Sequence, residues 1–238
     1  MKGVSFLYRR YRNPTLIVSD RKKRYNFMRM RKKKHRDERI ENCGELVISG
    51  SFPKGKWSDV FGNDNKIYLE IGCGKGRFIT ETAKHNPGIN FIAIEKNLDV
   101  ALLAMEKAQK AELSNIRFIC NNADLLEEII MPGECSRIYI NFCDPWHKAK
   151  HAKRRLTHRR YIELYQSLLP QYGEIHFKTD NKNLFEFSLN EFCDMNIKLK
   201  NISLDLHAKP CEWNIMTEYE QLFSQQGMPI YRLEAVFE

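Results

Sequence analysis

Residues 67–76 read IYLEIGCGKG, an apolar run that ends in three glycines at every second position. The run Ile67–Ile71 is short and rich in β-forming residues, which predicts a buried strand. Gly72, Gly74 and Gly76 allow the backbone to turn sharply and to approach a ligand where a side chain would collide. A helical pattern follows directly. The stretch therefore predicts a strand, a glycine-rich ligand loop and a helix.

Downstream of this stretch, β-rich apolar runs alternate with helical patterns. The expected strands are Ile67–Ile71, Phe91–Ile94, Ile116–Cys120, Ile138–Phe142, Glu174–Phe177, Ile197–Leu206 and Ile230–Phe237. Two amphipathic helices are expected at Leu98–Leu113 and His158–Leu169. The alternation predicts an α/β fold with a doubly wound, mostly parallel, Rossmann-like sheet and an antiparallel C-terminal strand. Ligands of such sheets bind at the carboxyl ends of the strands.

Positive charge is concentrated at the N-terminal end of the chain. The net charge is +9, and residues 1–40 hold 15 Lys and Arg against 3 Asp and Glu, while the remainder holds 24 against 27. We expect residues 1–40 to form a basic, mobile arm and residues 41–238 to form one domain. Aromatic residues among these charges favour binding to a phosphate backbone, and a solvated tail is the alternative.

Composition disfavours several classes of protein. The apolar runs are shorter than the roughly 20 residues that cross a bilayer, and arginines within residues 9–12 interrupt any signal peptide. The seven cysteines form no CxxC pair, so neither a disulfide framework nor a zinc site is indicated. His147, His151 and His158 lack acidic partners in the sequence around them, and we predict no metal. These features predict a cytoplasmic protein with reduced thiols.

Polar side chains also lie at the ends of the first three expected strands, next to the glycine loop or level with it. Glu70 lies at the end of the first strand, and Glu95 ends the second, 19 residues beyond Gly76. A carboxylate there can accept both hydroxyls of a ribose. Asn122 follows the third strand, and Arg77 stands where a nicotinamide-binding loop needs its third glycine. A nucleoside-bearing cofactor other than NAD is favoured, while solvated strand ends and a helix cap are the alternative roles.

The fourth expected strand leads into NFCDPWHK, residues 141–148. Asp144 is therefore expected at a carboxyl end beside the cofactor, where it is placed for chemistry. A second basic run follows, and it includes Lys148, Arg154 and Arg155. A basic run beside the site favours a polyanionic substrate, with these residues as candidate contacts, and a solvated charged loop is the alternative.

Taken together, these motifs resemble those of the bacterial tRNA (guanine-N7)-methyltransferases, a family of class I S-adenosylmethionine-dependent methyltransferases. The resemblance runs from about Met28 to the end of the chain. It is carried by RMRKKK (29–34), YLEIGCGKG (68–76), NFCDPW (141–146), KRRLTHRRY (153–161), HFKTDN (176–181) and NIMTEYE (214–220). The last two motifs are more specific than the glycine loop. The sequence departs from the family at Cys143 and His147, where proline is usual.

The resemblance implies transfer of a methyl group from S-adenosylmethionine to N7 of a guanine in tRNA, at guanine 46 of the variable loop. The expected cofactor-binding residues are Glu70, Gly72, Gly74, Gly76, Glu95, Asn122 and Asp144, of which Asp144 is also the expected catalytic residue. The expected substrate-binding residues are Lys148, Arg154, Arg155, Asp180, Thr217, Glu218, Tyr219 and Glu220. The expected partner is tRNA, with no membrane, and the enzyme is expected to be a monomer or a homodimer.

The chemistry of the target narrows the roles of the acids. N7 of guanine has a free lone pair, so its attack on the methyl group needs no base, and positioning and electrostatics dominate. We expect Asp144 or Asp180 to accept hydrogen bonds from guanine N1–H and N2–H. Glu218 and Glu220 are the next candidates for this role. Asp180 as a helix cap and Glu220 as a solvated side chain are the simpler roles.

Two other functions remain open from the sequence. One is a methyltransferase that acts on another nucleobase or on protein. The other is a non-catalytic RNA-binding module on the same fold, against which the intact glycine loop and Asp144 argue.

Overall fold

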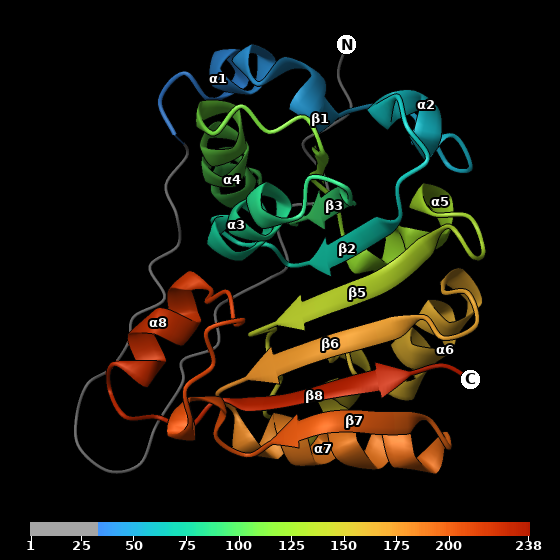
Figure 1. Ribbon diagram of the computed structural model, residues 1–238, viewed down its shortest axis with the longest axis vertical. Coiled ribbons are helices and arrows are strands. Elements are labelled where there is room, and N and C mark those ends of the chain that lie inside the picture. The colour runs from blue at the N-terminus through green and yellow to red at the C-terminus, as the bar shows by residue number, and fades with distance from the viewer. Residues whose placement is uncertain (1–32) are drawn as a thin grey trace. The chain divides into compact units, whose positions relative to one another are not determined.

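The computed structural model describes residues 33–238. Its centre is an eight-stranded sheet with the order β1-β4-β3-β2-β5-β6-β8-β7 (Figure 1). The strands are β1 (Val47–Ile48), β2 (Ile67–Ile71), β3 (Asn90–Ile94), β4 (Ile116–Ile119), β5 (Cys135–Asn141), β6 (Glu174–Thr179), β7 (Lys198–Ser203) and β8 (Tyr231–Val236). Strands β1 to β6 pair in parallel, and β8 runs antiparallel to β6 and β7. The predicted fold class is confirmed.

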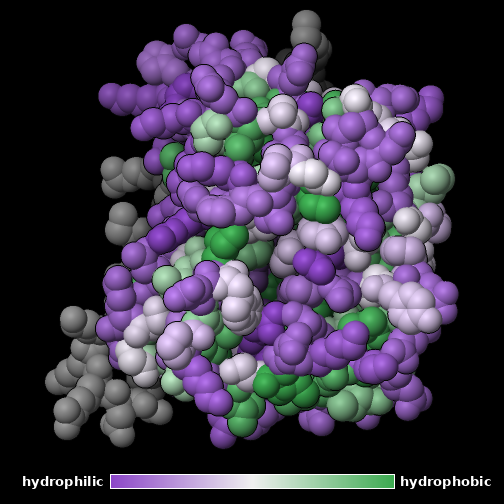
Figure 2. All heavy atoms as spheres, viewed as in Figure 1, coloured by the Kyte–Doolittle hydropathy of each residue, from purple (hydrophilic) through white to green (hydrophobic). Residues whose placement is uncertain are grey.

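Helices cover both faces of the sheet. They are α1 (Arg36–Asn42), α2 (Trp57–Phe61), α3 (Arg77–His85), α4 (Leu98–Lys110), α5 (Leu126–Ile129), α6 (Arg159–Leu168), α7 (Lys182–Asp194) and α8 (Glu218–Ser224). Apolar side chains of α3 and α4 pack on one face, and those of α5, α6 and α7 pack on the other. The molecular face in Figure 2 is mostly hydrophilic, because the large apolar side chains fill these two cores.

The structure corrects the expected end of the arm. No regular structure was expected before Ile40, yet α1 begins at Arg36. A helix of this length is not stable alone, so it leaves no clear periodic signal. It is held by α4, because the guanidinium of Arg39 donates to both carboxylate oxygens of Glu106, at 2.7 and 2.8 Å. The rest of the expected arm, residues 1–32, lies outside the described residues.

Gly76 permits α3 and α4 to approach closely. Its φ is +81°, and a Cβ built on it would lie 2.7 Å from Cα of Ala104 and closer still to the Cβ of that residue. Backbone cannot yield as a flexible side chain does. The third glycine of the loop is therefore required by helix packing.

We expect Gly76→Ala to lower the free energy of unfolding by about 2–4 kcal/mol, because overpacking adds to the cost of a positive φ. Gly227→Ala is the matched control, since Gly227 has φ +70° with nothing within 4 Å of its Cβ position. The control should lose only about 1–2 kcal/mol. Urea denaturation measures both, and equal losses would show that the contact with α4 does not matter.

Candidate active site

The site lies at the edge of the sheet where the parallel strands end. The loops after β2, β3, β5 and β6 reach this edge, and α8 lies beside the ends of β5 and β6 (Figure 1). Aromatic packing helps to hold α8 there, since the ring of Phe223 lies 6.2 Å from that of Phe142. Loops that carry the expected cofactor residues and the expected substrate residues are thus brought to one edge.

Gly72 and Gly74 leave open space over the loop after β2. Their φ angles are +81° and +58°, and nothing lies within 4 Å of the positions that a Cβ would take. The loop is tied to β3, because the amide of Gly72 donates to the carbonyl oxygen of Ile94 at 2.7 Å. Gly72 and Gly74 therefore suit close approach of a ligand, whereas Gly76 serves the packing of α4.

Glu95, directly after β3, holds the glycine loop in place. Its Oε2 accepts from the amide of Gly74 at 3.1 Å, and its Oε1 accepts from the amide of Asn97 at 2.9 Å. Burial raises the pKa of Glu95, and these two hydrogen bonds oppose the shift. Each oxygen keeps a second lone pair. Glu95 is therefore not an ordinary solvated strand end, and it can still accept from the hydroxyls of a ligand.

Glu70, near the end of β2, is a buried carboxylate with one oxygen in use. The residue is 1% exposed, and its Oε1 accepts from Nδ2 of Asn141 at 2.9 Å. Burial raises the pKa of Glu70 to about 8, against the opposing effects of the Asn141 hydrogen bond and of Lys178. Oε2 of Glu70 and Oδ1 of Asn141 are buried without a hydrogen-bond partner in residues 33–238.

These two acceptors fit the amino group of S-adenosylmethionine. A protonated amino group has three N–H donors, and its charge favours an ionised carboxylate. Buried polar atoms in native proteins are nearly always hydrogen bonded, so orphan acceptors on two linked side chains indicate a place where a ligand donates. The residues present therefore match the methionine part of this cofactor.

Asn122 lies in the loop after β4. Its side chain is exposed, and its Nδ2 donates to Oδ2 of Asp124 at 2.8 Å. It precedes the 3-10 turn Ala123–Leu125 but makes no capping hydrogen bond with its side chain. The helix-cap alternative therefore does not apply, and a contact with adenine stays a prediction.

Asp144 lies on a loop with unusual backbone geometry. Its neighbours Phe142 and Trp146 have φ angles of +53° and +42°, which non-glycine residues rarely adopt. The amide of Phe142 donates to the carbonyl oxygen of Lys178 at 2.8 Å, and Nη2 of Arg155 donates to that of Trp146 at 3.1 Å. Strained backbone that its surroundings hold in place is common at functional sites.

The carboxylate of Asp144 is accessible. Its side chain is 58% exposed and pairs with Nζ of Lys96 at 3.0 Å. Exposed ion pairs of this kind are weak, so Asp144 can exchange Lys96 for another partner. The site therefore holds a carboxylate on a fixed loop with a replaceable counter-ion.

The three expected basic contacts differ in exposure. Lys148 and Arg154 are exposed, and the guanidinium of Arg154 lies 4.9 Å from the centre of the Trp146 ring. Arg155 is half-buried, with its guanidinium 4.3 Å from the Phe187 ring and its hydrogen bonds spent on the Asp144 loop. Lys148 and Arg154 thus lie at the surface, whereas Arg155 supports the loop.

The expected substrate residues at 217–220 divide into two structural and two accessible side chains. Oγ1 of Thr217 accepts from the amide of Glu220 at 2.9 Å and so caps α8. Glu220 is fully buried, which rules out the solvated alternative, and its Oε2 lies 2.6 Å from Nζ of Lys178. Glu218 pairs with Lys107, at 2.6 Å, on the more open side of the helix.

Tyr219 lies near two acids of the site. It is 41% exposed, and its ring stacks on that of Phe223 at 6.1 Å. Burial raises its pKa, and the carboxylates of Asp144 and Glu95 raise it further. The phenol therefore lies within electrostatic reach of both the Asp144 loop and Glu95, which binds the glycine loop.

Asp180 does not cap the helix that follows it. The N-cap of α7 is Asn181, whose Oδ1 accepts from the amide of Leu184 at 2.8 Å. Burial raises the pKa of Asp180, and His147 opposes the shift. The carboxylate of Asp180 therefore does not cap the helix, and its contact with the substrate stays a prediction.

Three polar residues of the site had been given no role from the sequence: Lys96, Asn141 and Lys178. For Lys178, its place in the motif HFKTDN (176–181) was a usable signal. For Lys96 there was none, because its partner Asp144 lies 48 positions away in the chain.

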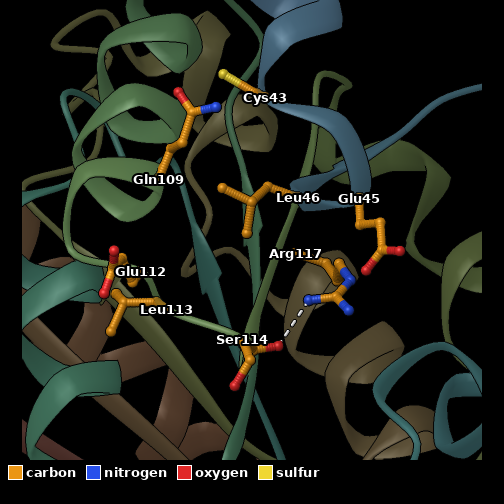
Figure 3. Close-up of a pocket in the computed structure, with 8 residues that line it drawn as sticks. All are labelled: Cys43, Glu45, Leu46, Gln109, Glu112, Leu113, Ser114 and Arg117. Atoms are coloured by element: carbon orange, nitrogen blue, oxygen red, sulfur yellow. Dashed lines mark hydrogen bonds between the residues drawn. The ribbon is translucent and has the colours of Figure 1, made fainter.

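A separate cavity of about 250 Å³ lies outside this site (Figure 3). Ser114, just before β4, and Arg117, near the start of β4, line it, at the end of the parallel strands opposite the glycine loop. Within residues 33–238 no group of three or more His, Cys, Asp or Glu side chains is placed to hold a metal ion. None of the described helices is long and apolar enough to span a membrane.

Similarity to known proteins is extensive. The family described as "Putative methyltransferase" matches residues 64–233. The chain is 50% identical over 212 residues to the tRNA (guanine-N(7)-)-methyltransferase of Listeria monocytogenes, which covers 89% of this chain and 99% of that protein. It is 47% identical over 208 residues to the protein of the same name from Bacillus subtilis, with 87% and 98% covered.

Solved structures share the fold at low identity. The 16S rRNA methyltransferase KamB matches with a TM-score of 0.59 and 11% identity over 79% of this chain and 95% of its own. A 16S rRNA (adenine(1408)-N(1))-methyltransferase from Catenulisporales acidiphilia, solved with its cosubstrate SAM, matches with a TM-score of 0.57 and 11% identity over 79% and 92%. These likenesses support the fold alone.

We predict that Glu70 makes the free protein less stable as the pH rises. Its pKa is about 8 in the folded protein, above its ordinary value of 4.5. The folded state therefore holds the proton more tightly, so stability falls between about pH 4.5 and about pH 8 and then levels off. Glu70→Gln removes this loss, and its melting temperature should rise relative to that of the unmodified protein across that range.

The exposed Glu163 on α6 offers a control. Glu163→Gln should leave the pH dependence of the melting temperature unchanged. A difference between Glu70→Gln and the unmodified protein that stays constant with pH would contradict the assignment of a raised pKa to Glu70.

Proposed function

The chain belongs to the family of tRNA (guanine-N(7)-)-methyltransferases, and we propose that it transfers the methyl group of S-adenosylmethionine to N7 of a guanine in tRNA, giving 7-methylguanosine. The observation that carries this proposal is the pair of orphan acceptors on Glu70 and Asn141 beside an open glycine loop. By the family resemblance, the target is guanine 46 of the variable loop.

Four groups at the edge of the sheet where the parallel strands end would hold the cofactor. When bound, the cofactor supplies an electrophilic methyl group on its sulfonium. Glu70 and Asn141 would accept from the amino group. The loop at Gly72 and Gly74 would allow the backbone to approach, and the free lone pairs of Glu95 would accept from the ribose. Asn122, by the family resemblance, would read the adenine.

Asp144 is assigned to the guanine side of the reaction. N7 attacks with its own lone pair, so Asp144 removes no proton from it. Its fixed, accessible carboxylate is suited to accept from N1–H and N2–H, which stabilises the positive charge that develops in the purine. Asp180, with its raised pKa, is the second candidate for this contact. The chemistry proposed here requires no metal ion.

Binding of the tRNA is assigned to the basic surface next to the Asp144 loop. Lys148 and Arg154 are exposed there, and Lys150 and Lys153 add to the positive charge. Tyr219 offers a partly exposed ring on which a base can stack. We propose that the basic residues before α1 add phosphate contacts and that the enzyme works in the cytoplasm as a monomer or a homodimer.

The test is a methylation assay with unmodified tRNA and methyl-labelled S-adenosylmethionine, followed by digestion and nucleoside chromatography. Label should appear in 7-methylguanosine. Asp144→Asn should lower kcat by about 100-fold or more, the scale for loss of one group that stabilises transition-state charge. Asp64→Asn, at an exposed position before β2, should leave kcat unchanged.

Label in another nucleoside, or in protein, would replace the proposed substrate. Binding of tRNA without any transfer would favour the RNA-binding module. Near-normal turnover by Asp144→Asn would remove Asp144 from the catalytic role while leaving the reaction itself intact.

A further inference from the structure

We propose that Lys178 is a positioning residue whose one buried ammonium group supports both halves of the site, the cofactor carboxylate Glu70 and the substrate-side segment 214–220. The proposal rests on the function proposed above and adds to it a residue that couples the two substrates. Lys178 lies near the end of β6, between β5 and β8 (Figure 1).

The ammonium group of Lys178 fastens the segment 214–220 to the sheet. Lys178 is 5% exposed, and its Nζ donates to Oε2 of Glu220 at 2.6 Å and to Oδ1 of Asn214 and the carbonyl oxygen of Ile215, both at 3.1 Å. These three bonds use all three N–H donors. Tyr219 belongs to the same segment, so its position over the site depends on this anchor.

The same ammonium group lies on the cofactor side of the sheet. Lys178 pairs with Asn141 in the register of β5 and β6, and Asn141 donates to Glu70. Nζ of Lys178 also lies 5.0 Å from the centre of the ring of Phe78, in the first turn of α3. Asn141 therefore lies between Lys178 and Glu70 in the order of the strands.

Neighbouring charges shift the pKa values of both Glu70 and Lys178. Burial raises the pKa of Glu70, Lys178 lowers it, and Glu218 and Glu95 raise it. Burial lowers the pKa of Lys178, Glu220 and Glu70 raise it, and Arg232 lowers it. The other titratable groups that face this cluster are Cys73, Tyr139 and His207.

Lys178 therefore favours the ionised form of Glu70 that the cofactor's amino group needs. Without the ammonium group, Glu70 would keep its proton to a higher pH, and the amino group would lose an ionic partner. The segment 214–220 would lose its anchor at the same time. A single side chain would thus affect the affinity for both substrates.

The variants must separate the charge of Lys178 from its structural support. Lys178→Met removes the charge but leaves the buried Glu220 without its ammonium partner, which is destabilising. The double variant Lys178→Met/Glu220→Gln removes both charges and leaves an amide to bond Asn214. Asn214→Ala keeps the ammonium group and removes the hydrogen bonds of Asn214 to Lys178 and to Glu220. Lys198→Met, on exposed β7, is the matched control.

The ionisation of Glu70 is read first in the free protein. Melting temperatures of each form and of its Glu70→Gln derivative are compared as a function of pH. In the unmodified protein, the difference in melting temperature between the protein and its Glu70→Gln derivative should stop growing near pH 8. In the double variant it should level off at least about one pH unit higher. Lys198→Met should behave as the unmodified protein does.

Ligand binding is read next. At pH 7.5, calorimetry should show S-adenosylhomocysteine bound about tenfold or more weakly by the double variant, since one pKa unit corresponds to tenfold. Asn214→Ala should weaken the binding of tRNA several-fold and leave that of S-adenosylhomocysteine unchanged.

Two results would overturn the inference. In one, the melting-temperature difference caused by Glu70→Gln levels off at the same pH in the double variant as in the unmodified protein. The role of Lys178 is then purely structural. The other is Asn214→Ala with unaltered affinity for tRNA. Failure of the unmodified protein to bind S-adenosylhomocysteine would instead contradict the proposed function itself.

Discussion

The site depends on a carboxylate that is buried at the end of β2, Glu70, with one of its oxygens left without a donor in residues 33–238. Burial of such a group costs free energy unless it is paired, and natural proteins keep that cost mainly where function requires it. The neighbouring strand supplies Asn141, which bonds Glu70 and carries a second orphan acceptor. An incoming ammonium group can donate to both acceptors, so the free energy lost by burying them without a donor is recovered when the ligand binds.

Polar side chains continue from this pair across the sheet. Glu70 bonds Asn141, Asn141 is the register partner of Lys178, and Lys178 pairs with the buried Glu220 below α8. Two hydrogen-bonded pairs, Glu70 with Asn141 and Lys178 with Glu220, are thus linked through neighbouring strands, and the charge of Lys178 lowers the pKa of Glu70. The arrangement explains why a helix of seven residues, α8, has a defined position at the site.

Periodicity predicted the sheet, because buried strands and amphipathic helices leave local patterns, and strand order placed Glu70, Glu95 and Asp144 at one edge. Features that depend on distant contacts were missed. Helix α1 is held by Glu106 of α4, and the buried Glu220 pairs with Lys178, which lies 42 positions away in the chain. The loop chemistry was also only partly visible, since Gly76 serves packing and Arg155 holds the Asp144 loop. Local sequence does not distinguish a residue that binds a ligand from one that shapes its binding site.

The central claim is that Glu70 is protonated in the free protein and releases its proton to the solvent when the already protonated amino group of the cofactor binds beside it. Calorimetric binding of S-adenosylhomocysteine at pH 7, in buffers of different ionisation enthalpy, counts the protons that are released. Because the pKa of Glu70 is about 8 in the free protein, the account predicts release of close to one proton, and none from Glu70→Gln. Tight binding by the unmodified protein with no proton released would contradict it.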